Sequence, residues 1–103
     1  SSNLASVNFK HYLRTISNHL MIIYATKAAN ISFENDVEDI DVDINQAIPC
    51  GLIANELISN AIKYSFKNKS SGTISIGFHW VDSHYQLIIA DNGIGLPKDI
   101  SFE

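Results

Sequence analysis

The chain has 103 residues, of which 46% are hydrophobic and 17% are charged. This composition is typical of a folded globular protein and excludes a disordered chain, so we expect one domain over residues 1–103 with a modest core. The net charge of −4, without a run of Lys or Arg, argues against a nucleic-acid partner. An acidic protein can still bind a polyphosphate when a cation and backbone N–H groups neutralise it.

The cysteine count and the lack of long apolar runs indicate the cellular compartment of the protein. The single Cys50 excludes an internal disulfide and favours a reducing compartment; without a paired His pattern, we expect a packed thiol. The sequence contains neither an apolar run of membrane-spanning length nor a signal peptide. The expected location is therefore the cytoplasm, although a longer parent chain could be membrane-anchored.

The first periodic stretch, residues 9–23, has apolar side chains at helical spacing. They are Phe9, Tyr12, Leu13, Ile16, Leu20 and Ile23. Lys10, His11, Arg14 and Asn18 fall on the opposite face, which predicts an amphipathic helix that packs on a sheet or another helix. Residues 24–30 then form a connection.

Two stretches of alternating polarity follow the first helix. Residues 31–37 alternate in polarity and predict a strand. In residues 37–44, VEDIDVDI, three carboxylates two residues apart could mimic a metal loop, but the glycine turn and terminal glutamate of a calcium loop are missing. We expect a half-buried strand with an acidic outer face.

The most informative stretch is residues 51–66, GLIANELISNAIKYSF. Pro49 suits a first helical turn, and the helix should run to about Phe66. Apolar residues cover most of the circumference of such a helix: Ile53, Ala54, Leu57, Ile58, Ala61 and Ile62. The remaining arc is one polar stripe: Asn55, Glu56, Ser59, Asn60 and Lys63. The stripe fits an ordinary solvent-exposed face as well as a surface that receives a ligand.

A hairpin and a glycine motif complete the chain. Residues 67–72 predict a loop, and residues 73–81 and 85–90 predict two strands of an antiparallel hairpin, with Ile74, Ile76, Phe78 and Trp80 on one face. His79 and His84 have no third ligand nearby in sequence, which argues against zinc.

Residues 91–97, DNGIGLP, place a carboxylate at the end of an apolar strand, before two glycines. Glycines permit positive φ and close backbone approach, and a carboxylate can accept a hydrogen bond from an exocyclic amine. The same letters also form an ordinary turn. The motif is neither a dinucleotide fingerprint nor a Walker A loop.

Taken together, the two motifs resemble a known family. NELISNAIKY, residues 55–64, resembles the N-box of sensor histidine kinases, and DNGIG, residues 91–95, resembles their G1 box. A strand hairpin separates the two motifs in that family as well. The wider phrase IPCGLIANELISNAIKYSF is similar to the subgroup whose N-box contains G-L-I-x-N-E-L. The resemblance covers about residues 9–97.

The resemblance implies a Bergerat-type ATP-binding fold, an α/β two-layer sandwich with helices on one face of a mixed sheet, incomplete at its C-terminus. It also implies ATP and Mg²⁺ as cofactors. Glu56 would be catalytic, orienting or activating groups near the γ-phosphate, and Asn60 would hold Mg²⁺ through its side-chain oxygen, a hard ligand. Lys63 and Tyr64 would reach phosphates or ribose.

At the other end of the implied site, Asp91 would bind the adenine amino group, with Gly93 and Gly95 shaping the pocket wall. The implied chemistry is transfer of the ATP γ-phosphoryl group to a histidine on a separate dimerisation and phosphoacceptor domain, with a response regulator downstream. Such catalysis depends on positioning and on neutralisation by Mg²⁺.

The chain departs from the family pattern in two ways. It stops at Glu103, before the ATP lid and the second glycine-rich box, and neither His11 nor His19 has the context of a phosphoacceptor. We therefore expect a fragment of a larger kinase that binds ATP weakly by itself. The alternatives are another Bergerat-type ATPase, such as an anti-sigma kinase, and a non-catalytic interaction module. Lys63 and Tyr64 favour the histidine kinase, because the other ATPases tend to be acidic there.

Overall fold

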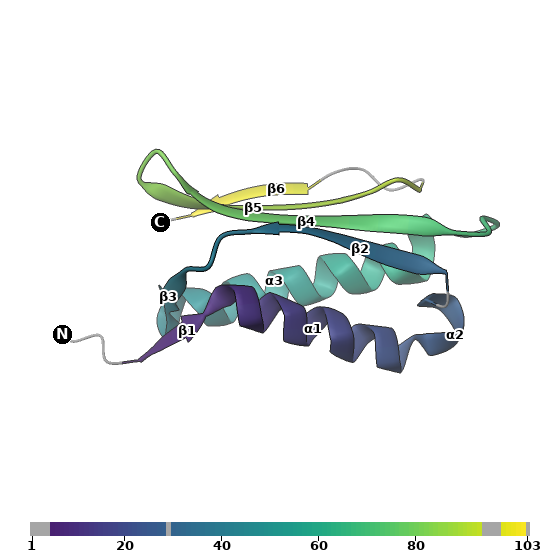
Figure 1. Ribbon diagram of the computed structural model, residues 1–103, viewed down its shortest axis with the longest axis horizontal. Coiled ribbons are helices and arrows are strands. Elements are labelled where there is room, and N and C mark those ends of the chain that lie inside the picture. The colour runs from purple at the N-terminus through teal and green to yellow at the C-terminus, as the bar shows by residue number, and fades with distance from the viewer. Residues whose placement is uncertain (1–4, 29, 94–97, 103) are drawn as a thin grey trace.

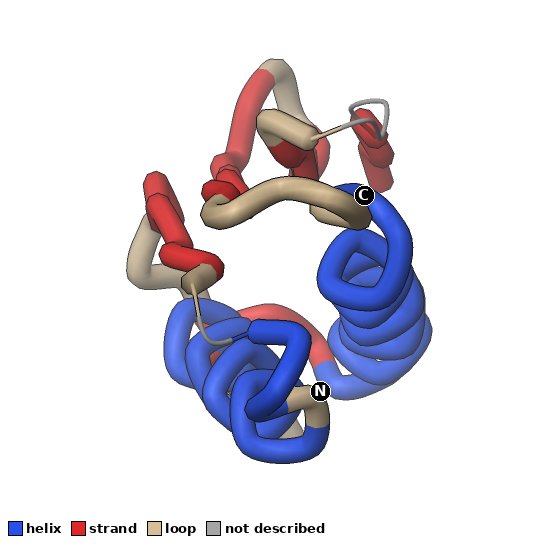
Figure 2. The backbone as a smooth tube through the Cα atoms, turned by 90° about the vertical axis from the view of Figure 1, so that its right-hand side faces the viewer, coloured by secondary structure: helices blue, strands red, loops and turns tan. Residues whose placement is uncertain are grey.

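The computed structural model describes residues 5–28, 30–93 and 98–102, and it has two layers. Helices α1 (Phe9–Ile23) and α3 (Ile44–Asn60) lie side by side beneath one face of a sheet (Figures 1 and 2). The strand order is β2-β4-β5-β6; β2 and β4 are parallel, and the other pairs are antiparallel. The predicted two-layer sandwich with a mixed sheet is confirmed.

Helix α1 begins where Asn8 caps it: the side-chain Oδ1 of Asn8 accepts a hydrogen bond from the backbone N–H of His11 at 2.9 Å. The predicted apolar face is buried at Phe9, Leu13 and Leu20, and it packs against α3. Ile23, at the end of the helix, is exposed instead. The expected connection after α1 contains a short helix, α2 (Ala25–Ala28).

Helix α3 begins earlier than the sequence indicated. Asp43 is its N-cap and accepts a hydrogen bond from the backbone N–H of Asn45 at 2.8 Å. Pro49 therefore lies inside the helix, and its expected place in the first turn was wrong. Because proline has no N–H, the carbonyl of Asn45 loses its helical donor. Both residues are exposed, so water can satisfy that carbonyl.

The C-terminal end of α3 changes its winding. Residues Ala61–Ser65 form a π-helix, η1, which continues α3 directly and is capped by Phe66. The helical segment thus ends where the sequence predicted, but its last turn is wider than an α-helical turn, because π-type hydrogen bonds span five residues.

The strands are β1 (Ser6–Asn8), β2 (Ile31–Val37), β3 (Asp41–Asp43), β4 (Gly72–Val81), β5 (His84–Asp91) and β6 (Lys98–Phe102). The acidic strand predicted over residues 37–44 is only three residues long; it pairs with β1, with Val42 buried and its two aspartates exposed. The predicted hairpin is β4–β5, and its turn residues Asp82 and Ser83 both have positive φ, as a tight two-residue turn requires. Strands β1 and β6 were not predicted.

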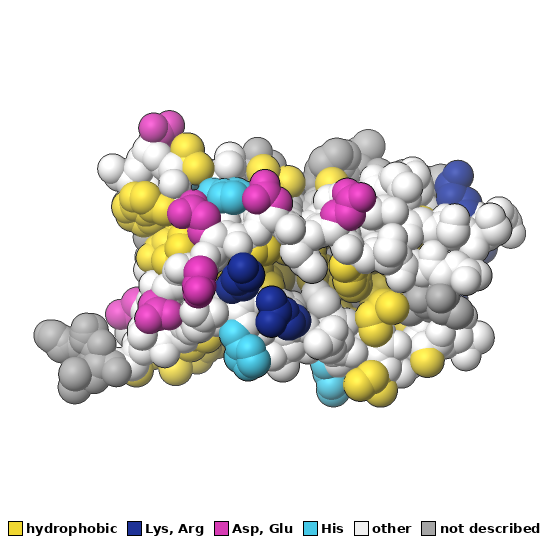
Figure 3. Space-filling view, in the orientation of Figure 1, with side chains coloured by type: hydrophobic (Ala, Val, Ile, Leu, Met, Phe, Trp, Pro, Cys, Tyr) yellow, Lys and Arg dark blue, Asp and Glu magenta, His cyan; other side chains and the backbone are white. Residues whose placement is uncertain are grey.

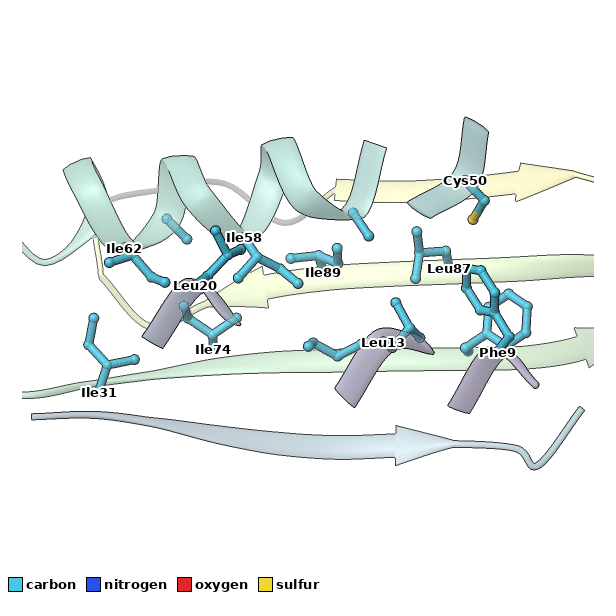
Figure 4. Packing of buried hydrophobic residues seen from close by; sticks show 14 of the residues in the cluster. Phe9, Leu13, Leu20, Ile31, Cys50, Ile58, Ile62, Ile74, Leu87 and Ile89 are labelled. Carbon is cyan, nitrogen blue, oxygen red and sulfur yellow. The ribbon is translucent and has the colours of Figure 1, made fainter. Parts of the chain in front are cut away.

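The core lies between the two layers. Figure 4 shows Leu13 and Ile58 from the helices and Leu87 and Ile89 from β5 pointing into the same space. Phe78 of β4 is fully buried against the ring of Phe9, with the ring centroids 4.5 Å apart. Trp80, expected on the same face as Phe78, lies near the hairpin turn and is half-exposed.

Cys50 packs in this core, as expected. Burial raises the pKa of its thiol to about 12, so the group stays neutral and unreactive in the folded protein. None of the helices in the described part of the chain is long and apolar enough to span a bilayer.

Candidate functional site

The polar stripe of α3 is centred on Glu56 and Asn60. The side-chain Nδ2 of Asn60 donates a hydrogen bond to Oε2 of Glu56 at 3.2 Å, one helical turn away. Glu56 is exposed and Asn60 is half-buried. With its nitrogen turned toward Glu56, Asn60 keeps its Oδ1 available as an acceptor. The pair therefore presents carboxylate and amide oxygens, the hard ligands that Mg²⁺ prefers.

The stripe is narrower than the sequence indicated. Ser59 is buried, and its hydroxyl donates to Oη of Tyr24 at 3.3 Å, so this residue joins α3 to the end of α1. On the expected apolar side, Ile53 is 40% exposed. The helix thus faces solvent over a wider arc than predicted, and only part of that arc is polar.

Lys63 lies in the π-helical turn that follows the stripe. Extrapolation along an α-helix puts Lys63 one turn beyond Asn60, but the wider turn of η1 shifts every residue that follows Asn60. Lys63 lines a pocket with Lys27 of α2, and neither Glu56 nor Asn60 lines that pocket. Its Nζ lies 5.3 Å from the centre of the Tyr64 ring, within cation–π range.

Asp91 is held at the end of β5 by two hydrogen bonds. The hydroxyl of Ser65 donates to its Oδ2 at 2.9 Å, and the backbone N–H of Gly93 donates to its Oδ1 at 2.9 Å. Ser65 is the last residue of η1 and is 6% exposed. Each carboxylate oxygen can accept a further hydrogen bond, so Asp91 is fixed in place but retains acceptor capacity for a ligand.

Gly93 is required for space. A Cβ at this position would collide with the backbone carbonyl of Ser65 and come within 3.0 Å of the ring of Phe66. None of the described glycines has a positive φ, so close backbone approach, and not left-handed geometry, explains the glycine here. Gly95 lies outside the described residues.

Asn92 anchors the same loop to the sheet. Its Oδ1 accepts from the backbone N–H of Thr73 at 2.9 Å, and its own backbone N–H donates to the carbonyl of Thr73 at 3.2 Å. The segment from Asp91 to Gly93 is therefore bonded both to the start of β4 and to the end of η1.

The structure thus joins the predicted residues in two groups, Glu56 with Asn60 and Asp91 with Gly93. Glu56 and Asn60 lie in α3, and Asp91 is joined to the end of η1 by its hydrogen bond with Ser65. Ser65 was not predicted from the sequence. A buried serine in a helix has no pattern of its own, and only its position after Lys63 and Tyr64 could have drawn attention to it.

Comparison with known proteins identifies the family. The family described as histidine kinase-, DNA gyrase B-, and HSP90-like ATPases matches residues 45–102, more than half of the chain. The chain belongs to this family. The resemblance predicted from the two motifs is therefore confirmed at the family level.

The similar proteins include several histidine kinases. Blue-light-activated histidine kinase 2 of Erythrobacter litoralis (strain HTCC2594) is 25% identical over 89 residues, which are 85% of this chain and 25% of that protein. The solved histidine kinase domain of a blue-light-activated kinase from Erythrobacter litoralis has a TM-score of 0.78 at 22% identity, covering 95% of this chain and 49% of that one. The histidine kinase AdeS of Acinetobacter baumannii has a TM-score of 0.61 at 22% identity, covering 89% of this chain and 43% of that one.

These likenesses show that the fold is that of a histidine kinase ATPase domain. This chain spans only a quarter of the curated relative and about half of the solved kinase domain.

The contact between Ser65 and Asp91 can be tested by Ser65→Ala. Removing a hydrogen bond to a partly buried carboxylate should lower the free energy of unfolding by about 1–2 kcal/mol, measured by urea denaturation. Ser70→Ala, in the exposed loop after η1, is the matched control and should change the free energy of unfolding by less than about 0.5 kcal/mol. Equal effects of the two substitutions would contradict a specific role for Ser65.

Proposed function

We propose that this chain is the ATP-binding part of a sensor histidine kinase and that Mg²⁺–ATP lies between Asp91 and the Glu56–Asn60 pair. The observation that carries the proposal is the placement of the Asp91 carboxylate, which Ser65 and Gly93 hold at the strand end. The family consists of ATPases, and the similar proteins are histidine kinases. Those relatives favour a kinase over the gyrase-like and chaperone-like branches.

At the adenine end, Asp91 supplies a fixed acceptor. Its two hydrogen bonds prevent the carboxylate from turning away, and the remaining lone pairs match the exocyclic amine of adenine. Guanine presents a carbonyl at the equivalent position, which the carboxylate would repel. The close approach of Gly93 to the Ser65 carbonyl holds the loop against the end of η1, where the loop would form one wall of the nucleotide pocket. Gly95 is proposed to extend this wall.

At the phosphate end, the described residues fit a shared Mg²⁺ site better than a protein cage. No group of three His, Cys, Asp or Glu side chains in the described residues could hold a metal ion, whereas Mg²⁺ commonly takes few protein ligands and completes its shell with phosphates and water. Asn60 would supply one oxygen, positioned by its hydrogen bond to Glu56. Mg²⁺ would neutralise phosphate charge when bound.

The proposed reaction transfers the γ-phosphoryl group of ATP to a ring nitrogen of a histidine on a separate phosphoacceptor domain, leaving ADP. Glu56 is exposed beside Asn60 and would orient or accept the proton of the incoming imidazole. Tyr64, exposed on η1, would contact ribose or phosphate, and Lys63 could reach a phosphate with its long side chain. A response regulator would then receive the phosphoryl group. We place the domain in the cytoplasm, where ATP is supplied.

The adenine role predicts the effect of Asp91→Asn. The new amide can keep both protein contacts, accepting from Gly93 through its oxygen and donating to the Ser65 hydroxyl through its nitrogen. It cannot offer a charged acceptor to adenine. ATP affinity, measured by titration calorimetry, should fall about tenfold or more, equivalent to about 1.4 kcal/mol, while GTP affinity should rise or stay the same, because the amide no longer repels the guanine carbonyl. Unchanged affinities for both nucleotides would contradict the role.

The Mg²⁺ role predicts the effect of Asn60→Ala. ATP affinity should then be the same in Mg²⁺ and in EDTA, because the protein no longer supplies an oxygen ligand to the Mg²⁺ that ATP carries. Asn18→Ala, an exposed asparagine on α1, is the control and should keep the wild-type difference. Calorimetry in both buffers is the measurement. Wild-type Mg²⁺ dependence in Asn60→Ala would show that another group holds the ion.

A further inference from the structure

Strand β2 lies at one edge of the sheet, with β4 on its inner side. The backbone N–H of Gly72 donates to the carbonyl of Asn30, and the N–H of Glu38 donates to the carbonyl of Phe78, so the even-numbered residues of this stretch face β4. Successive residues of a strand direct their N–H and C=O groups to opposite sides. The odd-numbered residues therefore present these groups at the free edge: Ile31, Phe33, Asn35 and Val37.

This edge is regular enough to accept another strand. β2 pairs with β4 in one continuous register from Ile31 to Val37, without a bulge. Its sequence, ISFENDV, contains neither the proline nor the lysine that commonly block an edge strand. Among the described residues, none forms a hydrogen bond with the outward-facing N–H and C=O groups of β2. An edge of this kind can take up an extended peptide through main-chain hydrogen bonds.

Two cations line the side of this edge that faces the helices. Lys10 and Arg14 of α1 are exposed and border a hollow together with Asn35 and Val37 of β2. Figure 3 shows two basic side chains next to each other over α1, in the middle of this face. The ion pairs within the described residues all involve His79, so neither cation has a carboxylate partner there.

The spacing of the two cations matches that of a strand. Lys10 and Arg14 are four residues apart, which is about 6 Å along a helix, and α1 runs alongside β2 (Figure 1). Side chains on the same face of a strand repeat every about 6.7 Å. Two acidic side chains that lie two residues apart on an added strand can therefore reach both cations.

The outer face of the same edge carries the opposite charge. Glu34 and Asp36 are exposed and border a hollow on this face with His79 of β4. Asp36 contacts His79, yet its side chain is still 89% exposed. Figure 3 shows acidic side chains above the two basic ones. Because a strand directs its side chains alternately to its two faces, the edge favours a segment with acidic residues toward α1 and basic residues toward Glu34 and Asp36.

A second copy of this chain does not fit the edge. Antiparallel pairing of two β2 strands about Asn35 would set Glu34 of one copy opposite Asp36 of the other. Like charges directly opposite each other destabilise a strand pair. The charge pattern therefore favours a different protein over self-association.

We propose that the free edge of β2 is a docking site for an extended segment of a partner protein in which acidic and basic residues alternate. Main-chain hydrogen bonds to β2 would hold the segment, and the charges of Lys10 and Arg14 on one face and of Glu34 and Asp36 on the other would select it. β4 lies between β2 and β5, the strand that carries Asp91. The docking site is therefore distinct from the proposed nucleotide site and does not depend on it.

The first test uses two blocked peptides of equal composition, EKEKEKEK and EEEEKKKK, in NMR titrations of the ¹⁵N-labelled chain at low ionic strength. The alternating peptide should bind about tenfold or more tightly than the block peptide. It should also slow hydrogen exchange at the outward-facing amides of Phe33, Asn35 and Val37. Equal affinities of the two peptides, or unchanged exchange at these amides, would overturn the proposal.

The cation role is tested by the double variant Lys10→Glu/Arg14→Glu, which should weaken binding of EKEKEKEK about tenfold or more. The control Lys27→Glu/Lys69→Glu makes the same change in net charge at exposed positions away from β2 and should weaken binding less than about twofold. All four side chains are exposed, so folding should be preserved. Equal losses in the two variants, or no loss in either, would overturn the role of the cations.

Strand addition is tested by N-methylation of the alternating peptide, either at its four glutamates or at its four lysines. An added strand directs the N–H groups of alternate residues toward its neighbour, so only one of the two methylated peptides should lose binding. Loss at the glutamates shows antiparallel addition, and loss at the lysines shows parallel addition. Equal affinities of the two methylated peptides would overturn strand addition.

Two further measurements separate this proposal from the other possibilities. Asp91→Asn should leave peptide binding unchanged, and Mg²⁺–ATP should not displace the peptide; displacement would overturn a separate edge site. The free chain should sediment as a monomer. A dimer with protected amides at Phe33, Asn35 and Val37 would show that a second copy occupies the edge and would overturn the proposed partner. Peptide binding in a chain that fails to bind ATP would support the edge site and contradict only the proposed function.

Discussion

The hydrogen bond between Ser65 and Asp91 joins the two parts on which the candidate site depends. Ser65 ends the helical segment that carries Glu56 and Asn60, and Asp91 ends the strand that leads into the glycine loop. The donor is buried and the acceptor is a carboxylate, so this bond is stronger than an exposed one. Gly93 closes the same junction from the other side. The distance between the helix stripe and the strand end is therefore set by local bonds and not by a flexible loop.

The π-helical turn gives this junction its geometry. A wider turn at Ala61–Ser65 changes which neighbours the last side chains of the helix meet. Ser65 contacts Asp91 of β5, while Lys63 lines a pocket with Lys27 of α2. These two side chains are two residues apart and therefore point to roughly opposite sides of the turn, and the hydrogen bond of Ser65 fixes which side faces β5.

Hydrophobic periodicity was enough to predict helix α1, strand β2 and the hairpin, because each buries one face and repeats along the chain. The features that it missed depend on contacts between distant residues. Asp43 can cap α3 only because its own strand ends there, which places Pro49 inside the helix. Ser65 gains its role from a carboxylate 26 residues later, and Lys27 lines a pocket with Lys63 only after folding. For the candidate site, the residue types were predictable from the two motifs, but their grouping was not. The π-helical turn that carries Lys63 leaves no periodic pattern in the sequence.

The most direct test of the central claim, a nucleotide bound between Asp91 and Asn60, is the NMR footprint of Mg²⁺–ATP on the ¹⁵N-labelled chain. The account predicts that the largest amide shift changes fall on Glu56, Asn60, Ser65, Asp91 and Gly93, with the outer face of the sheet unchanged. Changes confined to the outer face of the sheet, with Asp91 and Gly93 unaffected, would contradict it.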